Sequence, residues 1–311
     1  MNKSTVIVVS VTLVFVGVCV YLGVILEPVK PETSCGDKPE RPKLRKRMVG
    51  GTNVSLGVWP WHVSILHRFN SSAPFKHHCE GTIIQSQWVV SAAACFFKKE
   101  HVIRSDLIVK AGTVNLQEDG PETQVAEIAQ IIRHKYFNPV SLQHNIALLR
   151  LSAPLEFNSA VQEICTPDEF TGDHSYSSCH ITGFNKQGVL QEGWVEPIPN
   201  IRCNKRTWWN FRVTTNMECA GRYGGGTDGC DINIGGPLNC FLPLQHRYFI
   251  FGIRVVGDLC GVPQRPNIYL VTKRYYLWLE KYTTAAALHP LRAAHMFTLA
   301  LSLFSADILT Y

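Results

Sequence analysis

The segment Cys230-Asp231-Ile232-Asn233-Ile234-Gly235-Gly236-Pro237-Leu238 places branched apolar residues directly before a Gly-Gly-Pro turn. Ile234, the residue next to the turn, has no atom that can attack a substrate. No serine occurs between Ser178 and Ser302, so no serine hydroxyl in this part of the chain can take its place. The segment is a strong structural signature without a hydroxyl nucleophile.

Five further blocks precede this segment in the chain. They are Arg47-Met48-Val49-Gly50-Gly51, Trp59-Pro60-Trp61-His62-Val63-Ser64, Cys79-Glu80-Gly81-Thr82, Trp88-Val89-Val90-Ser91-Ala92-Ala93-Ala94-Cys95 and His144-Asn145-Ile146-Ala147-Leu148-Leu149-Arg150-Leu151. Together, and in this order, the six blocks resemble the chymotrypsin/trypsin family of serine proteases. The resemblance implies an all-β fold of two packed six-stranded antiparallel β-barrels with a C-terminal helix.

The pattern of apolar residues agrees with this architecture. Apolar runs of strand length are separated by Gly, Pro and Asn turn signals, which predicts many short strands. A late amphipathic stretch, residues 271–282, predicts one helix. The clearest strand runs are residues 82–84, 107–110, 146–151 and 248–256.

Catalysis in the family needs a hydroxyl nucleophile, an imidazole that takes its proton, and a carboxylate that orients the imidazole. The resemblance places Ile234 at the nucleophile, Ala94 at the base and Asn145 at the orienting position. None of these side chains can perform its step. The sequence therefore predicts an inactive homologue, with no catalytic residues, that acts as an extracellular protein-binding scaffold.

Two further catalytic devices are altered. Ile232 stands at the oxyanion-hole position, where the family has a glycine, and its branched Cβ restricts the backbone path. Arg47-Met48 resembles an activation cleavage site, and Asn233 stands where an aspartate pairs with the new amino terminus. A neutral amide cannot neutralise that charge, so cleavage is not expected to activate the chain.

The resemblance also assigns a specificity pocket, and here two interpretations remain open. Asp228 matches the floor residue that selects Lys or Arg, whereas Asn267 replaces a wall glycine, and Val255-Val256-Gly257 lines the entrance. In the first interpretation the Asn267 amide fills the slot and hydrogen-bonds Asp228. In the second the pocket is open, and the alternative function is a serine-type endopeptidase with an unorthodox site and a trypsin-like preference.

The chain has 11 cysteines, of which Cys19 lies in an apolar N-terminal run. The other ten suit a disulfide framework, which forms in an oxidising compartment. The resemblance implies that one of the bridges, Cys35–Cys165, would keep the stem attached to the domain after cleavage at Arg47. The resemblance implies five pairs: Cys79–Cys95, Cys179–Cys240, Cys203–Cys219, Cys230–Cys260 and Cys35–Cys165.

The termini carry signals of their own. Residues 5–26 contain no charge and are long enough to span a bilayer, which predicts either a signal anchor or a cleaved signal peptide. The anchor would give a single-pass type II membrane protein with its ectodomain outside the cell; the signal peptide would give a secreted protein. The resulting organisation is a cytoplasmic N-terminus (1–4), the apolar segment (5–26), a stem (27–47), a trypsin-like domain (48–282) and an extension (283–311).

That C-terminal extension allows two interpretations. It is either a loosely packed or disordered tail or, from Ala285-Ala286-Ala287 onward, a faint lipid-anchor signal.

Positive charge is concentrated in the stem. Residues 38–47 hold six basic residues and one acidic residue, a net +5 of the chain's +6. The near-neutral remainder argues against a nucleic-acid partner. The basic run itself suits a cleavage site, a glycan-binding stem or a solvated linker.

Four further features bear on modification and binding. Asn53 and Asn70 begin glycosylation sequons. His77 and His78 are adjacent on an expected strand, where neighbouring side chains face opposite ways, so neither a metal nor a cofactor is expected. Residues 204–212 mix aromatic and basic side chains, which are either interface anchors or aromatics that pack inward.

Overall fold

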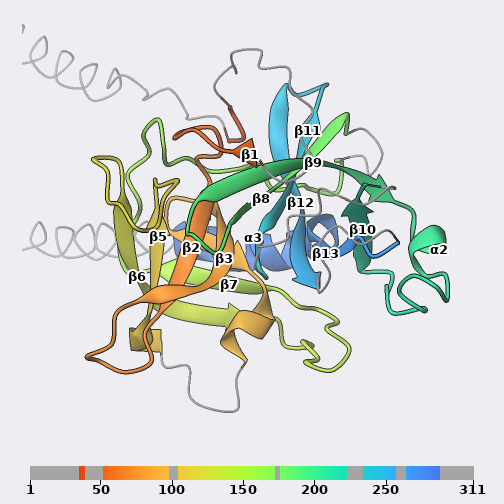
Figure 1. Ribbon diagram of the computed structural model, residues 1–311, viewed down its shortest axis with the longest axis horizontal. Helices are drawn as coiled ribbons and strands as arrows, with labels where there is room; N and C mark the ends of the chain where they lie inside the picture. Colours follow the sequence, from red (N-terminus) through yellow and green to blue (C-terminus); the bar gives the residue numbers. More distant parts are fainter. Residues whose placement is uncertain are drawn as a thin grey trace, which may run out of the picture. The chain divides into compact units, whose positions relative to one another are not determined.

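The computed structural model describes residues 35–38, 52–97, 104–171, 176–222, 234–256 and 264–287, all within one compact unit, Cys35–Tyr311. Antiparallel strands dominate these ranges, and the helices are short (Figure 1). The strands are rich in the β-branched and aromatic residues that pack well on a pleated surface.

The first half of the described chain closes into a six-stranded antiparallel barrel. Short 3-10 helices, η1 (Ala93–Phe96) and η2 (Arg104–Asp106), lie in its connections. Large aliphatic side chains such as Ile65, Ile83 and Leu149 are completely buried. Around the barrel the strands are β2 (His62–His67), β3 (Lys76–Gln85), β4 (Trp88–Ser91), β7 (Ala147–Leu151), β6 (Gln124–Arg133) and β5 (Leu107–Ala111).

The second half forms another six-stranded ring, closed by pairing of its first and second strands, and β1 (Thr52–Asn53) adds to its outside along β9. A short helix, α2 (Asn200–Cys203), follows β9. Around this barrel the strands are β8 (Ser178–Phe184), β9 (Leu190–Ile198), β10 (Met217–Gly221), β13 (Asn267–Val271), β12 (Arg247–Val256) and β11 (Pro237–Leu242).

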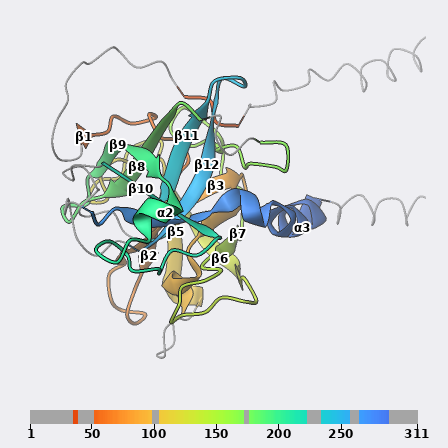
Figure 2. The ribbon, with the colours of Figure 1, turned by 90° about the vertical axis from the view of Figure 1, so that its right-hand side faces the viewer.

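The chain then turns into a helix, seen in blue in Figure 2. A 3-10 turn, η3 (Thr272–Tyr275), leads into α3 (Tyr276–Ala287), which buries Leu279 in the core. The α-helix begins at Tyr276 and not at residue 271, because Val271 ends β13 and the next four residues form η3, and it extends five residues beyond the end expected at residue 282. The predicted fold, two six-stranded antiparallel barrels with a C-terminal helix, is confirmed.

Buried hydrogen bonds join the two barrels. The Trp61 indole Nε1 donates to Asn239 Oδ1 at 2.8 Å, and His62 Nδ1 lies 2.9 Å from Thr182 Oγ1. Buried polar groups are costly unless they are paired, so each bond holds one barrel in a defined position on the other.

Four of the five predicted disulfides are confirmed: Cys35–Cys165, Cys79–Cys95, Cys179–Cys240 and Cys203–Cys219. The Cys230–Cys260 pair lies outside the described residues.

The first bridge holds a short piece of the stem against the second barrel. Gly36 donates its N–H to the Glu163 carbonyl at 2.8 Å and accepts from the Tyr248 N–H at 2.9 Å. The φ of Gly36 is +71°, and a Cβ at this position would lie 2.2 Å from the backbone carbonyl oxygen of Tyr248, so glycine is required. The stem is therefore fixed by backbone contacts as well as by sulfur.

Limited trypsin digestion after Arg47 is expected to leave the stem attached to the body. On a gel without reductant the cleaved chain should migrate as one species, and reductant should release the stem. A Cys35→Ser/Cys165→Ser variant should release it without reductant. Release from the wild-type chain under non-reducing conditions would contradict the prediction.

None of the helices within the described ranges is long and apolar enough to cross a membrane, and residues 5–26 lie outside those ranges.

Candidate functional site

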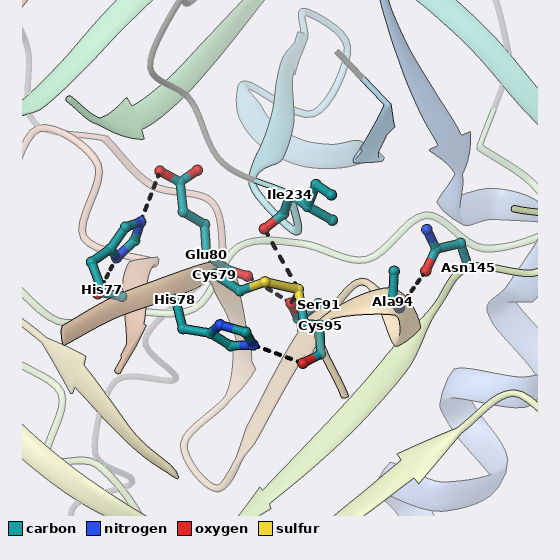
Figure 3. Close-up of a disulfide and its surroundings, with 10 residues drawn as sticks. His77, His78, Cys79, Glu80, Ser91, Ala94, Cys95, Asn145 and Ile234 are labelled. Atoms are coloured by element: carbon teal, nitrogen blue, oxygen red, sulfur yellow. Dashed lines mark hydrogen bonds and ion pairs between the residues drawn. A yellow bond between two sulfur atoms is a disulfide. The ribbon is translucent and has the colours of Figure 1, made fainter. Parts of the chain in front are cut away.

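The structure brings the predicted base and orienting positions together. Ala94 lies in η1, and Asn145 lies two residues before β7 begins. The Ala94 backbone N–H donates to Asn145 Oδ1 at 2.8 Å (Figure 3). Asn145 is completely buried, and its Nδ2 has no hydrogen-bond partner in the described part of the chain. The Asn145 side-chain amide therefore accepts a backbone N–H from the first turn of η1.

The predicted nucleophile position lies beside the same helix. The Ile234 carbonyl oxygen is 3.8 Å from Cys95 Sγ and accepts the Glu80 N–H at 3.0 Å. Ile234 as a residue is 38% exposed. This partly exposed residue, which has only an alkyl side chain, lies beside Cys95, the residue after Ala94.

The Gly235-Gly236 turn is clamped between β3 and β12. Gly235 donates its N–H to the Arg254 carbonyl at 3.0 Å, and Arg254 donates its own N–H to the Gly236 carbonyl at 2.9 Å. Gly235 has a φ of +94°, and a Cβ there would lie 2.2 Å from the backbone carbonyl oxygen of Glu80. Only glycine fits this approach.

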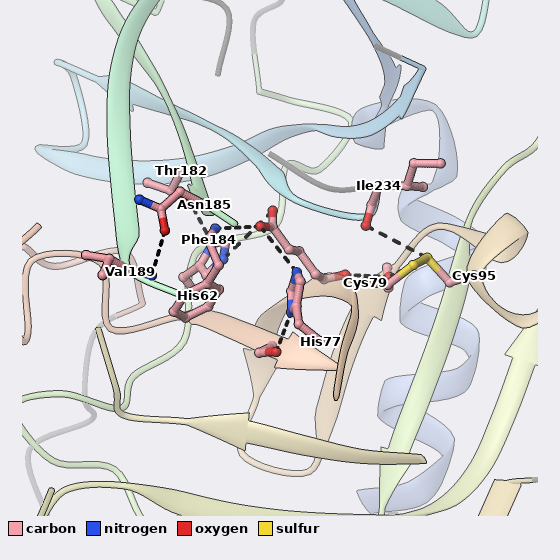
Figure 4. A network of polar contacts seen from close by, with 12 residues as sticks. His62, His77, Cys79, Cys95, Thr182, Phe184, Asn185, Val189 and Ile234 are labelled. Carbon is pink, nitrogen blue, oxygen red and sulfur yellow. Dashed lines mark hydrogen bonds and ion pairs between the residues drawn. A yellow bond between two sulfur atoms is a disulfide. The ribbon is translucent and has the colours of Figure 1, made fainter. Parts of the chain in front are cut away.

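The sequence prediction missed a carboxyl group beneath this turn. Glu80 is completely buried in β3, and its Oε1 accepts the Phe184 N–H at 2.7 Å. His62 Nε2 lies 3.9 Å from one carboxyl oxygen, and His77 Nε2 lies 4.0 Å from the other (Figure 4). A Cβ on Gly236 would stand 2.3 Å from Glu80 Oε2, so the turn packs directly on the carboxyl group.

The two imidazoles next to Glu80 are held in their neutral form. Burial lowers the pKa of His62 to about 3, with a second contribution from His77. Burial also lowers the pKa of His77 to about 4, with a second contribution from His78. His77 Nδ1 makes a 2.6 Å hydrogen bond with Ser64 Oγ. At neutral pH these rings are hydrogen-bonding groups within the protein.

The described part of the pocket wall also contains a charge that the sequence prediction missed. Arg254 is 4% exposed and pairs directly across the sheet with Tyr269, which is 1% exposed. Asn267, two residues before Tyr269, is 3% exposed and shares its face of β13. Val255 is buried and Val256 is half-buried. A buried arginine therefore lies beside residues assigned to the pocket, on the strand next to Asn267.

Adjacent His77 and His78 reach different partners, since His78 Nε2 bonds the Cys95 carbonyl at 2.8 Å whereas His77 turns to Ser64. Among the residues that the structure describes, no group of three or more His, Cys, Asp or Glu could hold a metal.

The remaining predicted positions divide into two groups. Asn53 on β1 and Asn70 in a turn are both exposed. The others lie outside the described residues, so the predictions for them stand as made: Arg47, Met48, Asp228, Ile232, Asn233 and Gly257.

Comparison with known proteins agrees with the two-barrel fold. The family model described as Trypsin matches residues 48–279. The chain belongs to the trypsin family. Bovine (Bos taurus) coagulation factor XI is similar to this trypsin-family chain, with 33% identity over 251 residues. The match covers 77% of this chain and 38% of factor XI, so the chain spans well under half the length of that relative.

Proposed function

We propose that this trypsin-family chain is catalytically inactive and serves as an extracellular protein-binding scaffold. The observation that carries the proposal is the 2.8 Å bond from the Ala94 N–H to Asn145 Oδ1. An active site of this family has an imidazole and a carboxylate at these two positions, and they remove the proton from the nucleophile. A methyl group and an amide have no group that accepts that proton.

The nucleophile position supports the same conclusion. Ile234, a residue that is 38% exposed and has only an alkyl side chain, lies where a substrate carbonyl would have to be attacked. The turn that follows is held by backbone contacts with Glu80 and Arg254, which fixes the position of Ile234.

Buried Arg254 weighs against the alternative function, a protease that uses Asp228 to select Lys or Arg. Arg254 is 4% exposed and pairs across the sheet with Tyr269, so its long side chain takes up space beside the pocket wall that a basic substrate side chain would need. Asn267, buried on the adjacent strand, occupies further space in the wall.

The scaffold itself supports a binding role. Both barrels close, and four disulfides brace them, so the chain keeps a rigid surface although its catalytic groups are replaced. Disulfides form in oxidising compartments, which supports the proposal that the domain lies outside the cell, either tethered through residues 5–26 or secreted. On this proposal its ligand is another protein.

The test is hydrolysis of Arg- and Lys-ester substrates together with covalent labelling by an organophosphonate, using the full glycosylated chain before and after cleavage at Arg47. We expect neither turnover nor labelling, because both need an activated nucleophile. Trypsin serves as the positive control. Labelling or turnover by the wild-type chain would contradict the proposal.

A restored variant separates lost chemistry from a collapsed site. If it hydrolyses the esters, the scaffold lacks only its reactive groups. If it stays inert, residues outside the triad, such as Glu80 and Arg254, also block the site. The variant carries Ala94→His, Asn145→Asp, Ile232→Gly, Asn233→Asp and Ile234→Ser.

A further inference from the structure

The loop that contains α2, residues 200–216 and here called the α2 loop, is strongly basic. No acidic residue occurs between Glu196 and Glu218. In Figure 1 α2 lies at the edge of the second barrel, and in Figure 2 it faces the viewer. The four basic residues of the loop are all exposed: Arg202, Lys205, Arg206 and Arg212.

The loop is held rigidly from beneath. The Cys203–Cys219 bridge ties it to β10, and the Asn204 side chain crosses it, accepting the Val213 N–H at 2.9 Å and donating to the Val213 carbonyl at 2.7 Å. Trp209 is 5% exposed and donates Nε1–H to the Pro266 carbonyl at 2.9 Å. The two tryptophans of the loop therefore pack inward and serve as anchors.

Two apolar side chains of the same loop point the other way. Ile201 is 87% exposed and Phe211 is 73% exposed. Asn210 and Phe211 have φ values of +46° and +61°, a left-handed conformation that is unfavourable for a bulky residue. The anchored loop thus holds Phe211 in a strained conformation with its ring in solvent.

Three of the four basic residues of the loop have no acidic partner among the residues that the structure describes. Across the described ranges, Lys205, Arg206 and Arg212 form no ion pair. Arginines beside an exposed aromatic ring on a rigid surface are typical of binding hot spots in protein interfaces.

We propose that the α2 loop binds an acidic segment of a partner protein that carries apolar side chains between its carboxylates. The carboxylates pair with Lys205, Arg206 and Arg212, and the apolar side chains cover Phe211 and Ile201. A sulfated glycan would match the charges but has no apolar group for Phe211, so the exposed ring favours a polypeptide. The assignment rests on the binding function proposed above and names its ligand class.

The test is fluorescence anisotropy with the full chain and a labelled peptide in which Glu-Asp-Glu flanks Leu-Phe-Leu on both sides. A second peptide replaces the acids by Gln and Asn, and a heparin fragment is the glycan probe. Lys205→Glu/Arg206→Glu/Arg212→Glu is expected to weaken binding of the acidic peptide about tenfold or more, which corresponds to about 1.4 kcal/mol. Phe211→Ser is expected to weaken it about fivefold.

The matched control reverses three exposed basic residues elsewhere, Lys76→Glu/Lys135→Glu/Arg274→Glu, and should leave the affinity within about twofold. Three results would overturn the assignment: no binding at millimolar peptide, equal losses in the two triple variants, or loop-dependent binding of heparin alone. Hydrolysis of the ester substrates would instead overturn the proposed inactivity and would leave this binding result to be judged separately.

Discussion

Glu80→Ala is expected to lower the free energy of unfolding by about 3 kcal/mol. The substitution leaves the buried Phe184 N–H without its 2.7 Å acceptor, a loss of about 1–3 kcal/mol. It also empties the space under Gly236, and a buried cavity adds to that cost. Urea denaturation with the disulfides intact measures the change.

Glu80→Gln is the matched control, because the amide retains a carbonyl oxygen for Phe184 and nearly the same volume. We expect it to cost about 1 kcal/mol, well below the alanine variant. If the alanine variant unfolds within about 0.5 kcal/mol of wild type, the carboxyl group is not what supports the turn.

Much of the fold was predictable because it is encoded in local patterns. The apolar runs that became β5, β7 and β12, and the amphipathic stretch that became α3, have the periodicities of buried strands and a surface helix. The four disulfides followed from spacing that resembles a known framework. What the periodicity could not set is the end of α3, since nothing at residue 282 stops a helix.

The site was predictable only at positions that the family motifs mark. Ala94 and Asn145 meet as the motifs imply, yet Glu80 and Arg254 were overlooked, although Glu80 lies two residues before the apolar run 82–84 and Arg254 lies inside the run 248–256. That local signal was present in the sequence. Their partners, such as Phe184 for Glu80, lie about a hundred residues away and follow only from the packing of the barrels.

The α2 loop illustrates a choice that sequence left open. Two tryptophans and a phenylalanine occur there among basic residues, and the composition alone does not determine which of the rings are buried. The disulfide and the Trp209–Pro266 bond bury the tryptophans, and the positive φ of Phe211 turns its ring out. Only tertiary contacts distinguish these aromatics.

Acidification is expected to have the largest effect on stability. Burial lowers the pKa of His62 to about 3 and that of His77 to about 4, from a usual 6.5. The unfolded chain therefore binds protons that the folded chain excludes, so stability present above pH 6.5 is lost as the pH falls toward 4 and 3. Over 2.5 pH units each ring contributes roughly 3 kcal/mol, about 6 kcal/mol together at pH 4.

Burial is the largest cause of both lowered pKa values, although the Glu80 carboxyl group lies 3.9 Å from His62 and 4.0 Å from His77. Burial raises the pKa of Glu163 to about 6, which works in the opposite direction as the pH falls through 6. That carboxyl is only half-buried, and solvent screening keeps its effect small.

The His62→Gln variant distinguishes the effect of protonating the buried His62 ring from the other effects of low pH on stability. The amide can still bond Thr182, whose Oγ1 lies 2.9 Å from His62 Nδ1, but it does not take up a proton. We expect the loss of stability between pH 6.5 and 4 to shrink by about half. His246→Asn, at an exposed turn residue with a φ of +54°, should leave the full dependence unchanged. A wild-type unfolding midpoint that does not change between pH 6.5 and 4 would contradict the prediction. If the rings are neutral in the folded protein and protonated in the unfolded chain, stability has to fall with pH over this range.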